Sequence, residues 1–305
     1  MALRTRLADM TLRPIASWLV ARPQNAVIGL AGTLLLPFAQ VISGTLMALL
    51  VFKHGAALAA MQGAVATAIL AIISLLVSAS ASHVLANALV IWAPVILLVV
   101  MMRGWRSLTL TLQVTVIAAM VVTLAFYAIL GDPNVFWGEI LVRLSDSFRE
   151  MGLTQHADVL IDQRDVIAPQ MTILVVLTTW SLYAMVLLLG YAIYRTLPGV
   201  TSNFGRFRDL NFGRVLALTM AVASVIAMVT GAAWLQNFAF VIFAMFWLQG
   251  LAIVHWLHAE GRLPLAVVIL VYALIPLLNA LLVMGLAVVG YIDAWFGFRS
   301  RKPAP

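Results

Sequence analysis

Residues 54–102 read HGAALAAMQGAVATAILAIISLLVSASASHVLANALVIWAPVILLVVMM, a stretch without a single Asp, Glu, Lys or Arg. A helix needs roughly 20 mostly apolar residues to cross a hydrocarbon core about 30 Å thick. This stretch is therefore long enough to cross a membrane twice, with a turn around residues 80–83. Further uncharged runs occupy residues 23–52, 107–131, 166–194, 215–259 and 263–292.

The composition of the whole chain indicates the same fold class. Of its 305 residues, 64% are hydrophobic and 10% are charged, whereas soluble domains carry roughly 25% charged residues. The sequence lacks the alternating segments of about 10 residues that build a transmembrane β-barrel. We therefore predict an all-α, polytopic transmembrane helical bundle that forms a single integral membrane domain over residues 1–305, with full spans at about residues 55–79, 84–102, 107–130, 168–194, 212–232 and 237–258.

Two other hydrophobic segments are interrupted by proline. Residues 25–52 contain Pro37, and residues 264–291 contain Pro276. Proline removes a backbone hydrogen bond and kinks or breaks a helix. Each half would be about 12–16 residues long, or roughly 18–24 Å, which is short for a crossing. We expect two Pro-broken helical hairpins, which bring the total to 8–10 hydrophobic helices.

The basic residues predict the orientation, because cytoplasmic loops are enriched in Lys and Arg. If both hairpins return to the side they entered from and the N-terminus is cytoplasmic, 15 of the 18 Lys and Arg residues are cytoplasmic. Single crossings would instead place the cluster from Arg195 to Arg214 outside. We expect a multi-pass protein of the cell inner membrane with both termini cytoplasmic, namely a basic segment at 1–24 and a tail at 293–305, and no cleaved signal peptide.

The connection at residues 132–165 holds the three remaining basic residues and seven acidic ones, for a net charge of −4. Its first part reads DPNVFWGEILVRLSDSFREMGL, in which Asp132-Pro133 is a typical helix start. Apolar residues then follow on one helical face, at Trp137, Ile140, Leu141, Leu144, Phe148 and Met151. We predict an extracytoplasmic amphipathic helical insertion. It is either a connector that rests at the membrane interface or a lid over a cavity.

The lid interpretation nominates ligand contacts. Within the insertion these are Trp137, Glu139, Arg143 and Asp146. The hydrophobic segments add uncharged polar groups such as Gln40 and Asn237, which either satisfy one another or line a cavity for a neutral or weakly polar ligand.

Small residues recur every four positions in the segment that begins at His54. Such spacing lets helix backbones approach closely within a membrane. One row consists of Ala56, Ala60, Ala64 and Ala68, and the adjacent row of Gly55, Ala59, Gly63 and Thr67. The first row is either an internal helix contact or a docking face for a second membrane protein.

Signals for catalysis and metal binding are weak. The chain has no cysteine, and His255 and His258 fall short of the four ligands of a closed zinc site. No nucleotide-binding, zinc-protease or serine-hydrolase motif occurs. The basic residues are spread over loops, which does not indicate nucleic-acid binding. We expect no enzyme, no cofactor, no bound metal and no nucleic-acid partner.

Several stretches resemble the YybS-like family of uncharacterised bacterial multispanning membrane proteins. They are LPFAQVISGTLMALLVFKHGAALAAMQGAVA, FRDLNFGRVLA, FWLQGLAIVHWL and GLAVVGYIDAWFGFRSRK, the last with an Asp-x-Trp-Phe-x-x-Arg pattern. The family is distantly similar to the substrate-binding S components of energy-coupling-factor transporters. That resemblance implies ligand binding from the outer side and docking of a partner through small-residue helix faces, and it assigns no ligand-binding residue.

Two functions remain open at this stage. The first is a transport-related component that binds a small solute at an outward-facing cavity beneath residues 132–165. The alternative is a non-transporting membrane scaffold or regulator that recruits partner proteins or forms a homo-oligomer. Both place the chain in a lipid bilayer.

Overall fold

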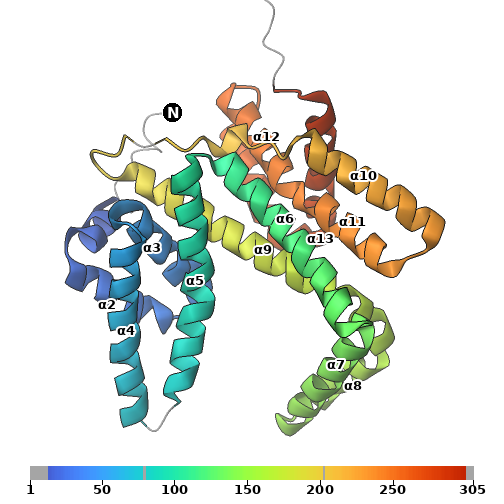
Figure 1. The fold of residues 1–305 in the computed structure, drawn as a ribbon, viewed down its shortest axis with the longest axis horizontal. Helices are drawn as coiled ribbons and strands as arrows, with labels where there is room; N and C mark the ends of the chain where they lie inside the picture. Colours follow the sequence, from blue (N-terminus) through green and yellow to red (C-terminus); the bar gives the residue numbers. More distant parts are fainter. Residues whose placement is uncertain (1–12, 78–79, 202, 300–305) are drawn as a thin grey trace, which may run out of the picture. The chain divides into compact units, whose positions relative to one another are not determined.

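The computed structural model describes residues 13–77, 80–201 and 203–299, and every regular element within these ranges is helical (Figure 1). Within these ranges, six helical stretches are long and apolar enough to cross a membrane, which confirms the predicted spans and makes the chain an integral membrane protein. They are α4 (Ala56–Leu76), α5 (Ala81–Trp105), α6 (Leu108–Leu130), α9 (Arg164–Thr196), α10 (Gly213–Thr230) and the continuous pair α11 (Ala233–Met245) and α12 (Trp247–Ala259).

The remaining elements are shorter or interrupted. They are α2 (Pro23–Leu34), α3 (Ala39–His54), α7 (Pro133–Glu150), α8 (Thr154–Asp162), the 3-10 turn η1 (Phe207–Asp209) and α13 (Leu265–Phe296). The chain divides into two compact units. Unit 1 comprises Met1–Thr111 and Ser181–Arg206, and unit 2 comprises Leu112–Trp180 and Phe207–Pro305.

The first proline-broken hairpin is confirmed in unit 1. Helix α2 ends at Leu34, and α3 begins at Ala39 directly after Phe38, whose φ of 61° is left-handed. A Cβ added to Gly29 would lie 3.0 Å from Leu46 Cδ2. Because these two residues stand at similar distances before and after Pro37, α2 and α3 fold back on each other.

Helix α3 is the centre of unit 1, and its residues from Ser43 to Phe52 are all buried. The Trp92 indole donates to the Ser43 hydroxyl over 3.0 Å, which satisfies both polar groups inside the bundle. A Cβ on Gly190 of α9 would lie only 2.4 Å from Ala48 Cβ. Helices α3 and α9 therefore approach as closely as a small-residue membrane contact allows.

Helices α12 and α13 form the closest contact in the described part of unit 2. A Cβ on Gly250 would lie 2.0 Å from Leu286 O, and one on Gly290 would lie 2.2 Å from Phe246 O. Neither position has room for any side chain. The two backbones therefore touch along this contact.

The chain also reverses within α13, as predicted for the segment containing Pro276. His255 packs edge to face on Tyr272, near the start of α13, and on Phe207. Arg299, just after the end of α13, donates to the backbone oxygen of Arg208. From Tyr272 to Phe296 a straight helix would be about 36 Å long, so a straight α13 would not bring both Tyr272 and its C-terminal end to the neighbouring residues Phe207 and Arg208. The helical assignment continues through residue 276, which shows a bend rather than a complete break.

Helix α7 confirms the predicted amphipathic element. The Asp132 carboxylate accepts from the Asn134 N–H over 3.0 Å and caps the helix, and Gly152 ends the turn with φ 77°. Only the first half of the apolar face is covered, because Trp137 and Leu141 are buried whereas Met151 is 62% exposed. In the second half, Phe148 packs edge to face on the ring of His156 in α8.

Candidate functional site

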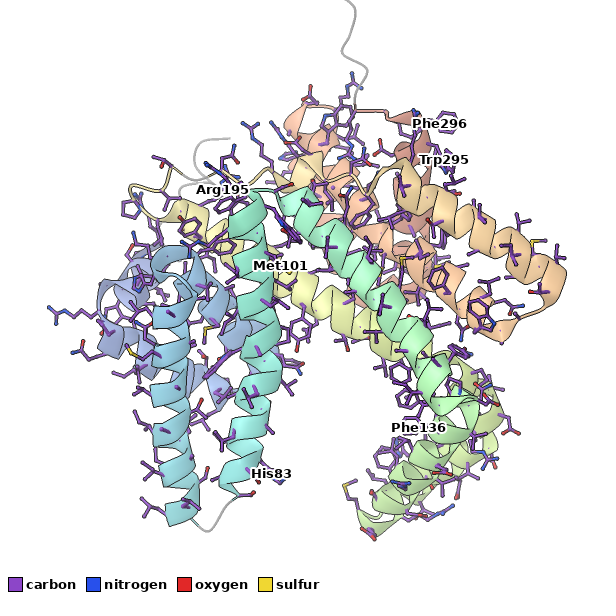
Figure 2. The ribbon with its side chains drawn as sticks, viewed as in Figure 1. His83, Met101, Phe136, Arg195, Trp295 and Phe296 are labelled. Carbon is purple, nitrogen blue, oxygen red and sulfur yellow. The ribbon has the colours of Figure 1, made fainter. Side chains whose placement is uncertain are left out.

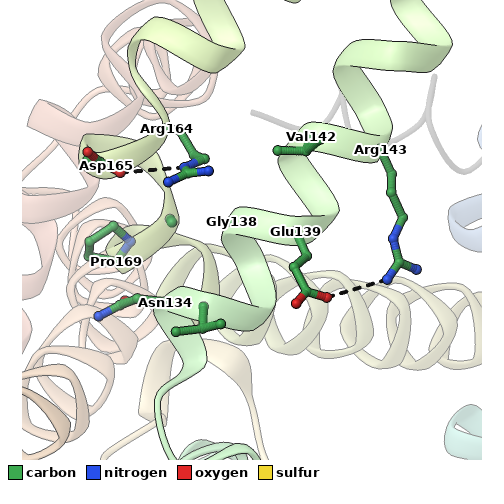
Figure 3. Close-up of a pocket in the computed structure, with 10 residues that line it drawn as sticks. Asn134, Gly138, Glu139, Val142, Arg143, Arg164, Asp165 and Pro169 are labelled. Carbon is green, nitrogen blue, oxygen red and sulfur yellow. Dashed lines mark hydrogen bonds and ion pairs between the residues drawn. The ribbon is translucent and has the colours of Figure 1, made fainter.

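A pocket of about 670 Å³ lies between α7 and the first turns of α9, within unit 2 (Figure 3). Ligand pockets typically measure about 300–1,000 Å³, so its size fits a small molecule. Its polar lining comes from Asn134, Glu139, Arg143, Arg164 and Asp165, and the rest from Val135, Gly138, Val142, Ala168 and Pro169.

A small apolar core positions the two walls. Trp137 and Leu141 of α7 pack on Ala168 of α9. The Trp137 indole donates to the Thr172 hydroxyl over 2.8 Å, and its ring stacks on Phe126 at 5.9 Å between centroids. These contacts fix α7 against α9 beneath the pocket, since a buried indole N–H needs a partner.

Each wall carries one cation and one anion. On α7, Arg143 Nη2 lies 3.5 Å from Glu139 Oε2, with the side chains 74% and 64% exposed. On α9, Arg164 Nε lies 3.5 Å from Asp165 Oδ1. Exposed pairs of this kind contribute about 0–1 kcal/mol. The four charges can therefore be redirected to a ligand at little cost.

The Arg164 side chain spans the gap between the walls. A Cβ on Gly138 would lie 3.8 Å from both Arg164 Cδ and Arg164 Nε. In Figure 3 the guanidinium reaches from the start of α9 toward α7, while Arg143 extends along the far side of α7. Arg164 is thus the cation that faces the interior of the pocket.

The structure brings together two of the six predicted ligand contacts. Glu139 and Arg143 line the pocket. Trp137 lies beneath it and is 9% exposed, so it supports the wall instead of facing a ligand. Asp146 lies elsewhere on α7 and pairs with Arg149 over 3.4 Å.

The other two predicted contacts lie in other places. Gln40 is exposed at the start of α3 in unit 1. Asn237 of α11 donates its amide to the Tyr127 hydroxyl of α6. Neither is among the residues that line the pocket.

Arg164 and Asp165 are pocket residues that the sequence reasoning missed. Both stand directly before the apolar run of α9. The sequence did contain a signal for them. A charged pair at the start of a membrane span has to lie at the same membrane interface as the amphipathic helix that precedes it.

The two small-residue rows of α4 have different surroundings. Ala59, Gly63 and Thr67 are buried, and a Cβ on Gly63 would lie 3.1 Å from the Trp92 ring. In the other row Ala56 is half-buried and Ala60, Ala64 and Ala68 are exposed. The internal helix contact is therefore made by the second row.

Each of the two histidines of α12 has one ring nitrogen within hydrogen-bond distance of an oxygen of the protein. His255 Nε2 lies 2.9 Å from the Tyr272 hydroxyl, and His258 Nδ1 lies 2.9 Å from Leu263 O. Across the described ranges, no group of three or more His, Cys, Asp or Glu side chains is placed to hold a metal ion.

No protein-family model, curated protein or solved structure matches this chain. The functional assignment accordingly rests on the geometry of the pocket and on the sequence.

Proposed function

We propose that this protein is a transport-related membrane component that binds a small zwitterionic solute between α7 and α9. The observation that carries the proposal is the pocket of about 670 Å³, whose interior Arg164 faces and whose lining also includes Asp165, Glu139 and Arg143. A ligand with a carboxylate and an ammonium group would complement both signs. A solute with a single charge would complement either the arginines or the carboxylates of the pocket, but not both.

The membrane orientation supports binding from the outer side. The distribution of Lys and Arg favours an orientation with both termini in the cytoplasm and with α7 and α8 on the extracytoplasmic face of the inner membrane. The resemblance to the YybS-like family, and more distantly to transporter S components, supports solute capture from that face. We propose no catalytic activity for the chain.

Thermal unfolding of the purified protein tests the proposal. The panel consists of neutral amino acids and betaines, with acetate and an alkylammonium ion as singly charged controls. A ligand that binds only the folded state raises its stability by RT ln(1 + [L]/Kd). We expect at least one zwitterion to raise the midpoint and both singly charged controls to leave it unchanged.

Matched variants locate the site. Arg164→Gln should abolish the shift with little change in the unliganded midpoint, because its ion pair is exposed. Arg149 also carries one positive charge, but it lies outside the pocket, where it pairs with Asp146 of α7 and Asp158 of α8. Arg149→Gln should therefore retain the shift. A flat response across the panel, or equal loss in both variants, would refute the proposal.

A second candidate is a scaffold that recruits another membrane protein. It is favoured by the exposure of Ala60, Ala64 and Ala68 on α4, because small residues at this spacing suit close helix packing. Ala60→Leu with Ala64→Leu should leave the folded chain intact and remove a partner that crosslinks to the wild type. Recovery of the isolated chain alone from the wild type would count against this function.

A further inference from the structure

The segment 207–212, here called the strap, opens the second part of unit 2 and leads into α10. Only residues 207–209 are helical, as the turn η1. Most of the remaining backbone groups of the strap therefore need partners from elsewhere in the protein. Those partners come from α12, from the residue just beyond α13 and from Gln113 of α6, which donates to the backbone oxygens of Asn211 and Phe212.

Arg299 holds two of the strap's carbonyl groups. Its Nη1 donates to Arg208 O and its Nη2 to Leu210 O, both over 2.7 Å. The planar guanidinium presents several donors in a fixed fork, so one side chain can fix two backbone positions at once. The same Nη2 lies 2.6 Å from Asp293 Oδ2.

Asp293 and Gln249 connect Arg299 to a third backbone group of the strap. Asp293 is fully buried and accepts from Gln249 Nε2 over 2.8 Å. Gln249 Oε1 in turn accepts from the backbone N–H of Phe212 over 2.7 Å. Asp293, Arg299 and Gln249, here called the lock, thus bind the strap at Arg208, Leu210 and Phe212.

Asp293, the member of the lock that belongs to α13, lies on the buried face of the last turn of this helix. Ala294 beside Asp293 is also buried, whereas Phe296 is 61% exposed. Figure 2 shows Trp295 and Phe296 pointing outward from this end of the helix. The carboxylate therefore faces α12 and the strap.

The closed lock is not fully satisfied. Within the described residues, Asp293 Oδ1 is buried without a hydrogen-bond partner. Desolvation of a buried ion pair can equal or exceed its attraction, whereas removal of one partner is strongly destabilising. The lock therefore specifies one arrangement of the strap without adding much net stability.

We propose that Asp293 and Arg299 form a conformational lock that holds or releases the strap and, with it, the start of α10. Phe212 is the N-cap of α10 and packs edge to face on Phe246 at 5.7 Å. Release frees the Phe212 N–H from Gln249, so the beginning of α10 loses this hydrogen bond to α12 and keeps those that Gln113 makes to Asn211 O and Phe212 O. This inference is independent of the solute pocket.

Limited trypsin digestion of the full chain in detergent tests the lock. Cleavage after Arg208 requires access to the carbonyl that Arg299 Nη1 occupies. Arg299→Gln should raise the rate of this cut by about tenfold or more, since proteolysis follows the population of the open form. Arg214→Gln is the matched control, because it removes one exposed arginine just beyond the strap, and it should leave the rate unchanged.

Two further variants test the lock if the Arg299→Gln protein does not fold. Arg299→Lys keeps the charge beside Asp293 but lacks the planar fork, so we expect a folded protein with an intermediate rate of cleavage after Arg208. Asp293→Asn with Arg299→Gln removes the unpaired charge and should melt above Arg299→Gln alone while the strap stays cleavable.

Two results would overturn the lock. One is a cleavage rate after Arg208 that is the same in wild type and in Arg299→Lys. The other is an equal rise after Arg206, Arg208 and Arg262, which would report general unfolding.

Discussion

The Trp137 indole donates to the Thr172 hydroxyl over 2.8 Å and so ties α7 to α9 directly beneath the pocket. Thr172 is 1% exposed, so its hydroxyl has no access to solvent. The pocket therefore depends on a residue that does not line it. Trp137 was predicted from the sequence as a ligand contact, and in the structure it lies beneath the pocket, outside the residues that line it.

Substitutions at Trp137 separate its hydrogen bond from its packing. Trp137→Phe keeps an aromatic ring and should lower the free energy of unfolding by about 1 kcal/mol, the typical net contribution of a hydrogen bond. Trp137→Ala should lower it by about 3–5 kcal/mol, because it leaves a cavity. Denaturant unfolding in mixed micelles measures both. Val135→Ala, at a position 62% exposed, is the control and should change it by less than about 0.5 kcal/mol.

Two glycines should respond to alanine in opposite directions. Gly190→Ala places a Cβ 2.4 Å from Ala48 Cβ, and such overpacking typically costs about 1–3 kcal/mol. Gly104 in α5 has nothing within 4 Å, so Gly104→Ala should stabilise the helix by up to about 1 kcal/mol. The measurement is the melting temperature, which should fall in Gly190→Ala and rise in Gly104→Ala. A stable Gly190→Ala protein would show that α3 and α9 are not in contact.

Two buried glutamines should likewise differ. Both amide atoms of Gln62 are buried without a partner among the described residues, and an unsatisfied buried group costs about 1–3 kcal/mol. Gln62→Leu should therefore raise the melting temperature. Gln249→Leu should lower it, because Gln249 is bonded to both Asp293 and Phe212. A loss of stability in Gln62→Leu would indicate that its amide has a partner in the membrane.

The absence of cysteine from the chain allows a direct test of orientation. Ser147→Cys on α7 and Thr201→Cys before the strap both place a thiol at an exposed, uncharged position. We expect a membrane-impermeant maleimide to label Cys at position 147 in intact cells. Position 201 should react only after the inner membrane is permeabilised. Labelling of position 201 in intact cells would contradict the predicted topology.

The sequence could predict the spans because length and apolarity decide them locally. A long apolar segment can cross a membrane by its own length and hydropathy, and all six predicted spans are found among the described residues. The break near Pro37 and the cap at Asp132 also depend on neighbouring residues only. These features were accordingly confirmed.

Contacts between distant segments could not be predicted in the same way. Arg299 and Arg208 are separated by 91 positions, and no local pattern relates a guanidinium to a particular carbonyl. The contact of Gly250 with Leu286 is equally remote in sequence. For the pocket, the sequence nominated Glu139 and Arg143 because they lie on one recognisable helix. It missed Arg164 because the second wall is defined only by the packing of α7 on α9.

The separation between the strap and Arg299 has a consequence for biosynthesis. A ribosome has to add 91 residues after Arg208 before Arg299, the partner of the Arg208 and Leu210 carbonyls, exists. Helices α10, α11 and α12 must therefore enter the bilayer while the carbonyls of the strap are still solvated or held by other groups. During this interval the strap of the nascent chain lacks the hydrogen bonds from Arg299. These bonds can form only after the last helix has been translated.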